Sequence, residues 1–125
     1  MIVPDYKDLI VWQKSIDLVV EVYRLVKKLP REETYALSDQ MRRAVVSIPS
    51  KIAAGHTCYP ESDCVETLSV ANGSKAAIET QLLICLRLNY LDESDAERAL
   101  SLCTEIGKML SAMISKLSYK LSADS

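Results

Sequence analysis

The side chains best suited to acid–base or nucleophilic chemistry are few and scattered along this chain. His56 is its single histidine, and an imidazole acts as a general base only beside a nucleophile such as Ser47, Ser50 or Thr57. Nothing in the spacing orients these hydroxyls toward the imidazole. The sequence also holds no Ser–His–Asp arrangement, carboxylate pair or glycine-rich phosphate loop. We therefore expect no catalytic residues and a protein that is not an enzyme.

The four cysteines give no sign of a metal site. Cys58, Cys64, Cys85 and Cys103 contain no C-x-x-C pair and fit no common zinc spacing, so we expect no metal and no cofactor. Two disulfides are possible in principle. However, Cys85 and Cys103 fall within apolar helical stripes, where a small buried thiol is the ordinary occupant. The N-terminus lacks the pattern of a signal peptide, and no apolar run approaches the roughly 18 residues of a membrane span. Together these features predict a cytoplasmic protein with no membrane partner.

The charged side chains exclude a protein that coats nucleic acid by bulk charge. Fifteen basic residues stand against seventeen acidic ones, for a net charge of -2. One run is locally basic: Arg24, Lys27, Lys28 and Arg31 place four cations within eight residues. Such a run either contacts phosphate groups or is the solvated end of a helix. Stacking on single-stranded bases is not favoured, because the chain has no phenylalanine and one tryptophan.

A second basic feature borders an apolar patch. On a helical wheel, Arg43 lies opposite the expected core stripe, whereas Arg42 lies beside Val46, Pro49 and Ala53. That patch is surplus to the packing of one subunit, and an apolar patch edged by arginine is typical of a subunit interface. The alternative is that Val46 and Ala53 simply widen the stripe that packs inside the subunit.

Lys75 and Glu79 are polar residues close to the middle of an apolar stripe, one helical turn apart. They are an ion pair at an oligomer seam, part of a buried polar network, or residues at a bundle end in water. The sequence leaves these alternatives open.

The elements that would position these side chains are helical. The 125 residues suit a single domain over 1–125, and 3 glycines with 4 prolines are too few for a sandwich or barrel. The first helical segment is expected from about Leu9 to Val26, ending before Pro30. Its apolar residues step by three and four: Leu9, Trp12, Ile16, Val19, Tyr23 and Val26. This heptad seam predicts close packing against partner helices.

The second segment is expected to begin near Ser38 as its N-cap and to end at Gly55, with a bend at Pro49. Its expected core residues share one face: Leu37, Met41, Ala44, Val45, Ile48 and Ile52.

The third and fourth segments each open with capping-box spacing. The third begins near Ser62 and runs to about Leu88, and the fourth begins at residues 94–97. The third buries one stripe: Cys64, Leu68, Ala71, Ile78, Leu82 and Cys85. The fourth buries another: Ala99, Cys103, Ile106, Leu110, Met113 and Leu117. Asn89, between them, tolerates the left-handed conformation common at helix ends. Because short connections force antiparallel neighbours, the sequence predicts an all-α, up-down-up-down four-helix bundle.

A longer motif extends this interpretation. Residues 42–55 read RRAVVSIPSKIAAG and resemble the RRAxxSIPSNIAEG signature of the four-helix-bundle proteins encoded in intervening sequences of bacterial 23S rRNA genes. Flanking segments agree: DLIVWQK at 8–14, GS at 73–74 with ETQL at 79–82, and NYL at 89–91, where the family usually has LGYL. The resemblance implies a ring-shaped homopentamer and a suspected contact with ribosomal RNA. More distantly, the chain is similar to the pentameric accessory proteins of diversity-generating retroelements.

The sequence departs from the family pattern at several positions. The basic residues usual after Gly55 are replaced by residues 57–60, TCYP, so that loop becomes less basic. The usual Asn is Lys51, and the usual Glu residues are Ala54 and Ala77. Two carboxylates are lost and one cation is gained, so the second helix becomes more basic. If the family role is anion contact, three residues are expected to bind RNA phosphates: Arg42, Arg43 and Lys51.

These observations predict partners of two kinds and no small-molecule substrate. The chain is expected to bind copies of itself through an interface formed by Val46, Pro49 and Ala53, and to bind ribosomal RNA. Two alternatives remain: a protein-interaction scaffold without nucleic-acid binding, and a degenerate passenger protein without retained activity.

Overall fold

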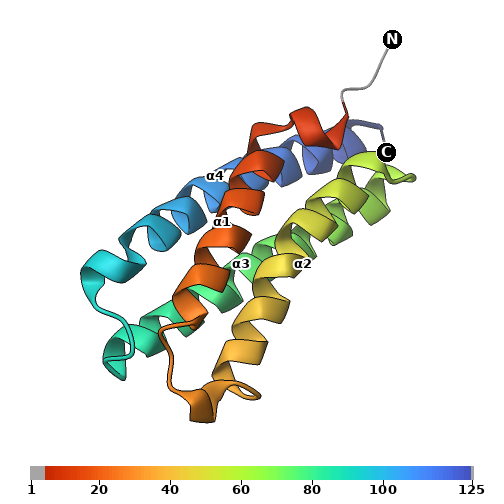
Figure 1. The fold of residues 1–125 in the computed structure, drawn as a ribbon. Helices are drawn as coiled ribbons and strands as arrows, with labels where there is room; N and C mark the ends of the chain where they lie inside the picture. Colours follow the sequence, from red (N-terminus) through yellow and green to blue (C-terminus); the bar gives the residue numbers. More distant parts are fainter. Residues whose placement is uncertain (1–4, 125) are drawn as a thin grey trace.

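The computed structural model describes residues 5–124, and these fold into four α-helices with no strand among them. The helices are α1 (Ile10–Val26), α2 (Leu37–Thr57), α3 (Glu61–Arg87) and α4 (Glu93–Asp124). Two short 3-10 helices precede α1 and α2, at Tyr6–Asp8 (η1) and Arg31–Glu33 (η2). Figure 1 shows the four α-helices lying side by side as a bundle. The predicted all-α class with four helices is confirmed.

Each helix lies beside a neighbour along most of its length. Near the start of α2, the Met41 sulfur lies 3.7 Å from the Cys85 sulfur, near the end of α3. Just after α1, the Lys28 ammonium lies 2.6 Å from a carboxylate oxygen of Asp95, in the first turn of α4. The core between the helices draws buried residues from all four of them.

The stripes of α3 and α4 are confirmed. All six residues predicted for α3 are buried. In α4, the four residues from Ala99 to Leu110 on the predicted seam are completely buried, while Met113 and Leu117 are partly buried and pack against the core. Each of these helices has one dominant apolar stripe, so its spacing alone identifies the buried face.

Helix α1 buries a different stripe from the one predicted. Its fully buried residues between the ends are Val11, Ser15, Leu18, Val22 and Leu25. Apart from Val26, the predicted seam lies about 100° further around the helix. There, Trp12, Ile16 and Val19 are only partly buried and Tyr23 is exposed. The prediction was wrong because α1 is apolar on two adjacent faces, and contacts distant in sequence select which one enters the core.

Helix α2 is longer than predicted at both ends. Its N-cap is Ala36, which supplies no side-chain hydrogen bond, and Ser38 lies inside the first turn. Gly55 does not end the helix. A Cβ atom there would lie 2.7 Å from Cδ2 of Leu68, so glycine is required for the close approach of α2 to α3. Pro49 lies within α2, which continues through it as one element.

The predicted capping boxes are displaced toward the N-terminus. Helix α3 begins before Ser62 and has Pro60 as its N-cap, without a side-chain cap. Helix α4 is capped by Asp92 and Asp95 rather than by the predicted pair at positions 94 and 97. The Asp95 amide donates to Asp92 Oδ1 at 2.8 Å, and the Asp92 amide donates to Asp95 Oδ2 at 3.0 Å. Short acidic side chains here perform the reciprocal capping that the longer Glu usually provides.

The cysteines divide into two pairs. Cys58 and Cys64 form a disulfide across the connection between α2 and α3, a pairing that the sequence left open. Cys85 and Cys103 are free and buried, as predicted. Burial raises the pKa of Cys85 to about 11 and that of Cys103 to about 12, so both thiols stay protonated at neutral pH. Between α3 and α4, Asn89 has φ 60°, the left-handed conformation expected there.

Candidate functional site

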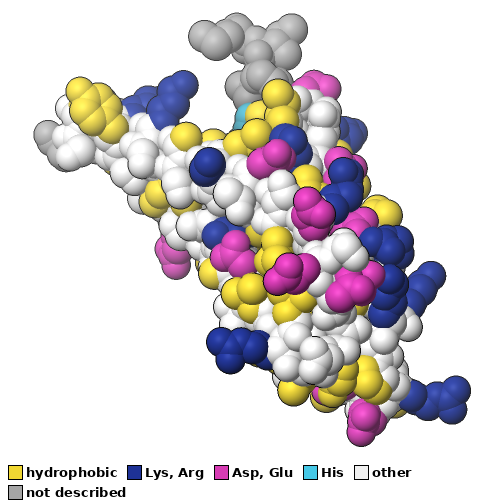
Figure 2. All heavy atoms as spheres, turned by 90° about the vertical axis from the view of Figure 1, so that its left-hand side faces the viewer, with side chains coloured by type: hydrophobic (Ala, Val, Ile, Leu, Met, Phe, Trp, Pro, Cys, Tyr) yellow, Lys and Arg dark blue, Asp and Glu magenta, His cyan; other side chains and the backbone are white. Residues whose placement is uncertain are grey.

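The face shown in Figure 2 does not present charge of one sign. On the face shown in Figure 2, acidic and basic side chains are interleaved, with apolar side chains between them. A binding site must therefore be found in local clusters. Among the described residues, these clusters include an apolar groove between α1 and α2, a hollow at the turn between α3 and α4, and polar or basic hollows.

The α1–α2 groove has a volume of about 340 Å³ and apolar side chains on both walls. Helix α1 and η1 contribute Tyr6, Trp12, Ile16 and Val19, and α2 contributes Val46, Pro49, Ser50 and Ala53. The three residues predicted for a subunit interface are therefore brought together here. Facing them is the seam of α1 that was predicted to enter the core.

Contacts of η1 with its cap and with α1 order one end of the groove. The Tyr6 ring meets the Trp12 ring edge-on, with centroids 5.4 Å apart and planes at 66°. Asp5 caps η1 by accepting a hydrogen bond from the Lys7 amide at 2.8 Å. The α1 wall of the groove is thus preorganised around the indole ring.

The α2 wall is graded from buried to exposed. Pro49 is buried and Ala53 is half-buried, whereas 41% of Val46 is exposed. Beyond this wall, Arg42 donates a hydrogen bond to the Thr34 carbonyl at 3.2 Å, which fixes its guanidinium against η2. Most of the wall's apolar area is therefore covered in the subunit, and Val46 remains available to a partner.

The three residues predicted to contact RNA do not converge on one point. Successive residues of a helix are about 100° apart, so Arg42, Arg43 and Lys51 point in three different directions around α2. Arg42 is half-buried toward α1 and η2. Arg43 is 80% exposed, with its Nε 2.9 Å from a carboxylate oxygen of Asp39. Lys51 is exposed on the flank nearer α3. Arg43 and Lys51 can touch phosphates, but only as separate contacts.

Lys75 and Glu79 occupy a hollow between α3 and α4. Their charged atoms are 3.8 Å apart, and 17% of the Lys75 side chain and 34% of the Glu79 side chain are exposed. The Lys75 stem packs against Gly107, where a Cβ atom would lie 3.0 Å from its Cε. Nearby, Asn72 Oδ1 is buried without a hydrogen-bond partner among the residues described. Of the alternatives for this pair, a half-buried polar network fits the subunit, and a bundle end in water does not.

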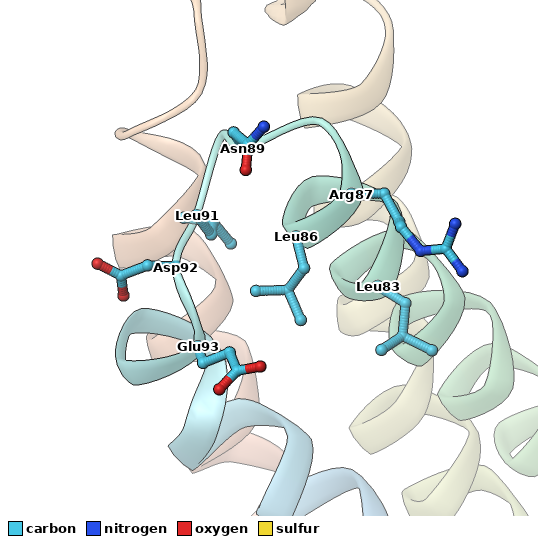
Figure 3. A pocket seen from close by; sticks show the side chains of 7 residues that line it. All are labelled: Leu83, Leu86, Arg87, Asn89, Leu91, Asp92 and Glu93. Atoms are coloured by element: carbon cyan, nitrogen blue, oxygen red, sulfur yellow. The ribbon is translucent and has the colours of Figure 1, made fainter.

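A hollow of about 600 Å³ lies at the turn between α3 and α4. Leu83 and Leu86 project into it from α3 and Glu93 from the start of α4, while Asp92 points away (Figure 3). Leu83 and its neighbours Ile84 and Leu88 are each at least 40% exposed. Apolar side chains therefore cluster at this tip of the bundle.

The described part of the chain assembles no candidate metal site. No cluster of three or more histidine, cysteine or acidic side chains suited to a metal ion occurs among residues 5–124. His56 lies half-buried in the last turn of α2, although the helix was expected to end at Gly55, one residue earlier. Among those same residues, no helix is long and apolar enough to cross a bilayer.

Sequence reasoning missed the residues that complete the groove. Trp12, Ile16 and Val19 were assigned to the core, although α1 carries a second apolar stripe that competes for that role. The excess of apolar residues on α1 was the available signal. A helix with two apolar faces can bury only one of them inside a four-helix bundle.

The fold and groove define a class: a four-helix-bundle protein with an apolar surface left over between two of its helices. Residues 7–112 match the model of the 23S rRNA-intervening sequence protein family, and the chain belongs to that family. A crystal structure of a protein of unknown function from the S23 ribosomal protein family of Bacteroides thetaiotaomicron is similar. It is 26% identical, with a TM-score of 0.77 over 84% of this chain and 98% of that one. No protein with a curated description matches the chain.

Proposed function

We propose that the protein is a non-enzymatic, cytoplasmic, ring-shaped homopentamer of antiparallel up-down-up-down bundles that contacts RNA, with ribosomal RNA as the first candidate. The α1–α2 groove carries the proposal. It combines Trp12, Ile16 and Val19 with the partly exposed Val46. Apolar area of this kind on a small domain marks an interaction surface.

Closure of a ring requires two different surfaces on each copy, because the contacts in a cyclic pentamer run head to tail. The groove is one of them. Helix α3 offers a second: Val70, Ala77 and Ile84 recur every seven residues on one face, and all three are exposed. An apolar ridge on α3 of one copy can thus fill the groove of the next, as ridges fill grooves between packed helices.

RNA contact is supported by the exposed cations of α2. Arg43 and Lys51 are both exposed, and Lys51 replaces an uncharged residue of the family pattern. Two cations per subunit bind phosphates weakly, but a ring repeats them and raises the overall affinity through multivalency. Contacts of this kind position the protein on RNA without reading its sequence.

A filter-binding titration with a 23S rRNA fragment at two salt concentrations tests the RNA contact. We expect affinity to fall steeply with salt, and the slope to be shallower in Arg43→Ala and Lys51→Ala, because each variant releases fewer counterions. Arg98→Ala, an exposed arginine on α4, is the matched control and should retain the original slope. An absence of binding at low salt would remove RNA from the proposal.

A protein-interaction scaffold is the second candidate, and the exposed Leu83, Ile84 and Leu88 favour it. Leu83 also lines the open hollow at this tip of the bundle, together with Leu86 and Leu91, and a partner's apolar side chain could bind there (Figure 3). This candidate replaces the first if Leu83→Asp abolishes partner binding in a protein that binds no RNA.

A further inference from the structure

A basic hollow lies at the end of the bundle where α1 ends, η2 follows and α2 begins. It has a volume of about 320 Å³ and seven lining residues: Val26, Lys27, Leu29, Arg31, Thr34, Ser38 and Arg42. Three of these are cations and none is a carboxylate. The hollows beside Lys14 and beside Lys75 differ, because basic and acidic side chains are mixed in both.

The three cations have no acidic partners. Neither Lys27, Arg31 nor Arg42 forms an ion pair with any residue in the range 5–124. Arg42 is held in place by its hydrogen bond to the Thr34 carbonyl, which leaves its charge uncompensated. Three positive charges around one hollow repel each other, and an anion bound between them would relieve that repulsion.

Neighbouring cations in the same basic run are neutralised. Arg24 pairs with Glu21 one turn earlier on α1, and Lys28 pairs with Asp95 of α4 at 2.6 Å. In the run from Arg24 to Arg31, the two cations that pair with carboxylates do not line the hollow, whereas the two that line it have no such pair in the described chain. A favourable interaction of these cations with the C-terminal end of α1 does not account for the whole cluster, because Arg42 belongs to α2.

The first turn of α2 borders the hollow through Ser38. The N-cap, Ala36, supplies no side-chain acceptor, so the first amides of the helix lack the usual cap. Ser38 lines the hollow with only 3% of its surface exposed, and its hydroxyl forms no hydrogen bond with the rest of the described chain. A ligand oxygen in the hollow would give this hydroxyl a hydrogen-bond partner.

We propose that this hollow binds a phosphate group. Its oxygens would accept hydrogen bonds from the α2 amides and the Ser38 hydroxyl, and its charge would be balanced by Lys27, Arg31 and Arg42. Uncapped helix N-termini favour phosphate because donors and the positive end of the helix dipole point the same way. The site shares Arg42 with the RNA contact proposed above but does not depend on it, since a free phosphate has the same chemistry as a backbone phosphate.

Amide chemical shifts in a ¹⁵N-labelled sample test the site directly. We expect added inorganic phosphate to shift the amides of residues 37–39 in a saturable way, while chloride at equal ionic strength does not. The double variant Lys27→Gln/Arg31→Gln should lose the shift, and both side chains are exposed, so the fold should tolerate it. Arg24→Gln is the matched control and should keep the shift. Ser38→Ala should weaken phosphate binding at least severalfold.

The result that overturns the site is a shift that does not saturate or that persists unchanged in the double variant. A single-stranded RNA oligonucleotide, tested on the same amides, identifies the source of the phosphate. If the RNA shifts residues 37–39 and the double variant weakens its binding, the site binds a backbone phosphate. If inorganic phosphate alone shifts them, the site stands and binds a small phosphorylated molecule. A failure of the RNA contact at Arg43 is thus distinguishable from a failure of this site.

Discussion

The two halves of the bundle use their apolar residues differently. Helices α3 and α4 each bury one apolar stripe, and their predicted stripes agree with the structure. Helices α1 and α2 bury one stripe and leave a second, which forms the groove around Trp12 and Val46. Periodicity therefore identifies the buried face when a helix has one apolar face. When a helix has two, periodicity identifies both faces but not which of them enters the core.

The largest expected difference between the halves concerns assembly. Val46→Asp should convert the assembly to single subunits, because an unpaired carboxylate in an apolar interface costs several kcal/mol. Val20→Asp is the matched control: Val20 is also exposed, lies on α1 and does not line the groove. Light scattering reports the mass, and circular dichroism verifies that the helices persist. Equal masses for the two variants would show that the groove does not mediate assembly.

Within the α3–α4 half, two adjacent leucines should behave in opposite ways. Leu82→Ala should lower the free energy of unfolding by about 3 kcal/mol, since it creates a cavity at a fully buried position. Leu83→Ala, one residue further along, removes a half-exposed side chain and should cost less than about 1 kcal/mol. Urea denaturation measures both. Similar losses would mean that the buried face of α3 is wrongly assigned.

A smaller effect distinguishes two glycines inside helices. Gly55→Ala should destabilise by roughly 1–3 kcal/mol, because the new methyl group would meet the Leu68 side chain at 2.7 Å. Gly73→Ala should stabilise by about 0.5–1 kcal/mol, because nothing lies within 4 Å and alanine favours helix. Thermal melts of both variants, in parallel, would show shifts of opposite sign.

The smallest effect at neutral pH belongs to the two buried thiols. Burial raises their pKa values above the ordinary 9.0, so the folded state favours the neutral form. That stabilisation is complete below about pH 9 and is lost as pH rises toward about 11 for Cys85 and about 12 for Cys103. The double variant Cys85→Ala/Cys103→Ala should therefore lose less unfolding free energy than the original chain between pH 8 and pH 11. Identical pH profiles would contradict this assignment.

Much of the fold could be predicted from the sequence, and the errors have physical causes. The stripes of α3 and α4 and the left-handed Asn89 follow from local periodicity and turn chemistry. Gly55 was read as a helix terminator because its real constraint, the contact with Leu68, is between helices and invisible to local rules. The cap of α4 shifted because Asp92 and Asp95 can cap each other at the same spacing as the predicted pair.

The candidate sites were less accessible to sequence reasoning. Val46, Pro49 and Ala53 were grouped correctly because they lie on one helix, where a wheel is sufficient. The proposed phosphate site could not be predicted in this way. Its cations, Lys27, Arg31 and Arg42, come from three segments and meet only when α1 and α2 pack. Likewise, a wheel gives the directions of Arg43 and Lys51 but not their surroundings.

The central claim is that the second apolar stripe of α1 and α2 is a surface for copies of the same chain. The most direct test is the mass of the unmodified protein in solution at micromolar concentration, measured by light scattering. We expect a particle of about five times the 13.9 kDa chain mass. A particle with the mass of one chain would contradict it, and the groove would then require a different partner.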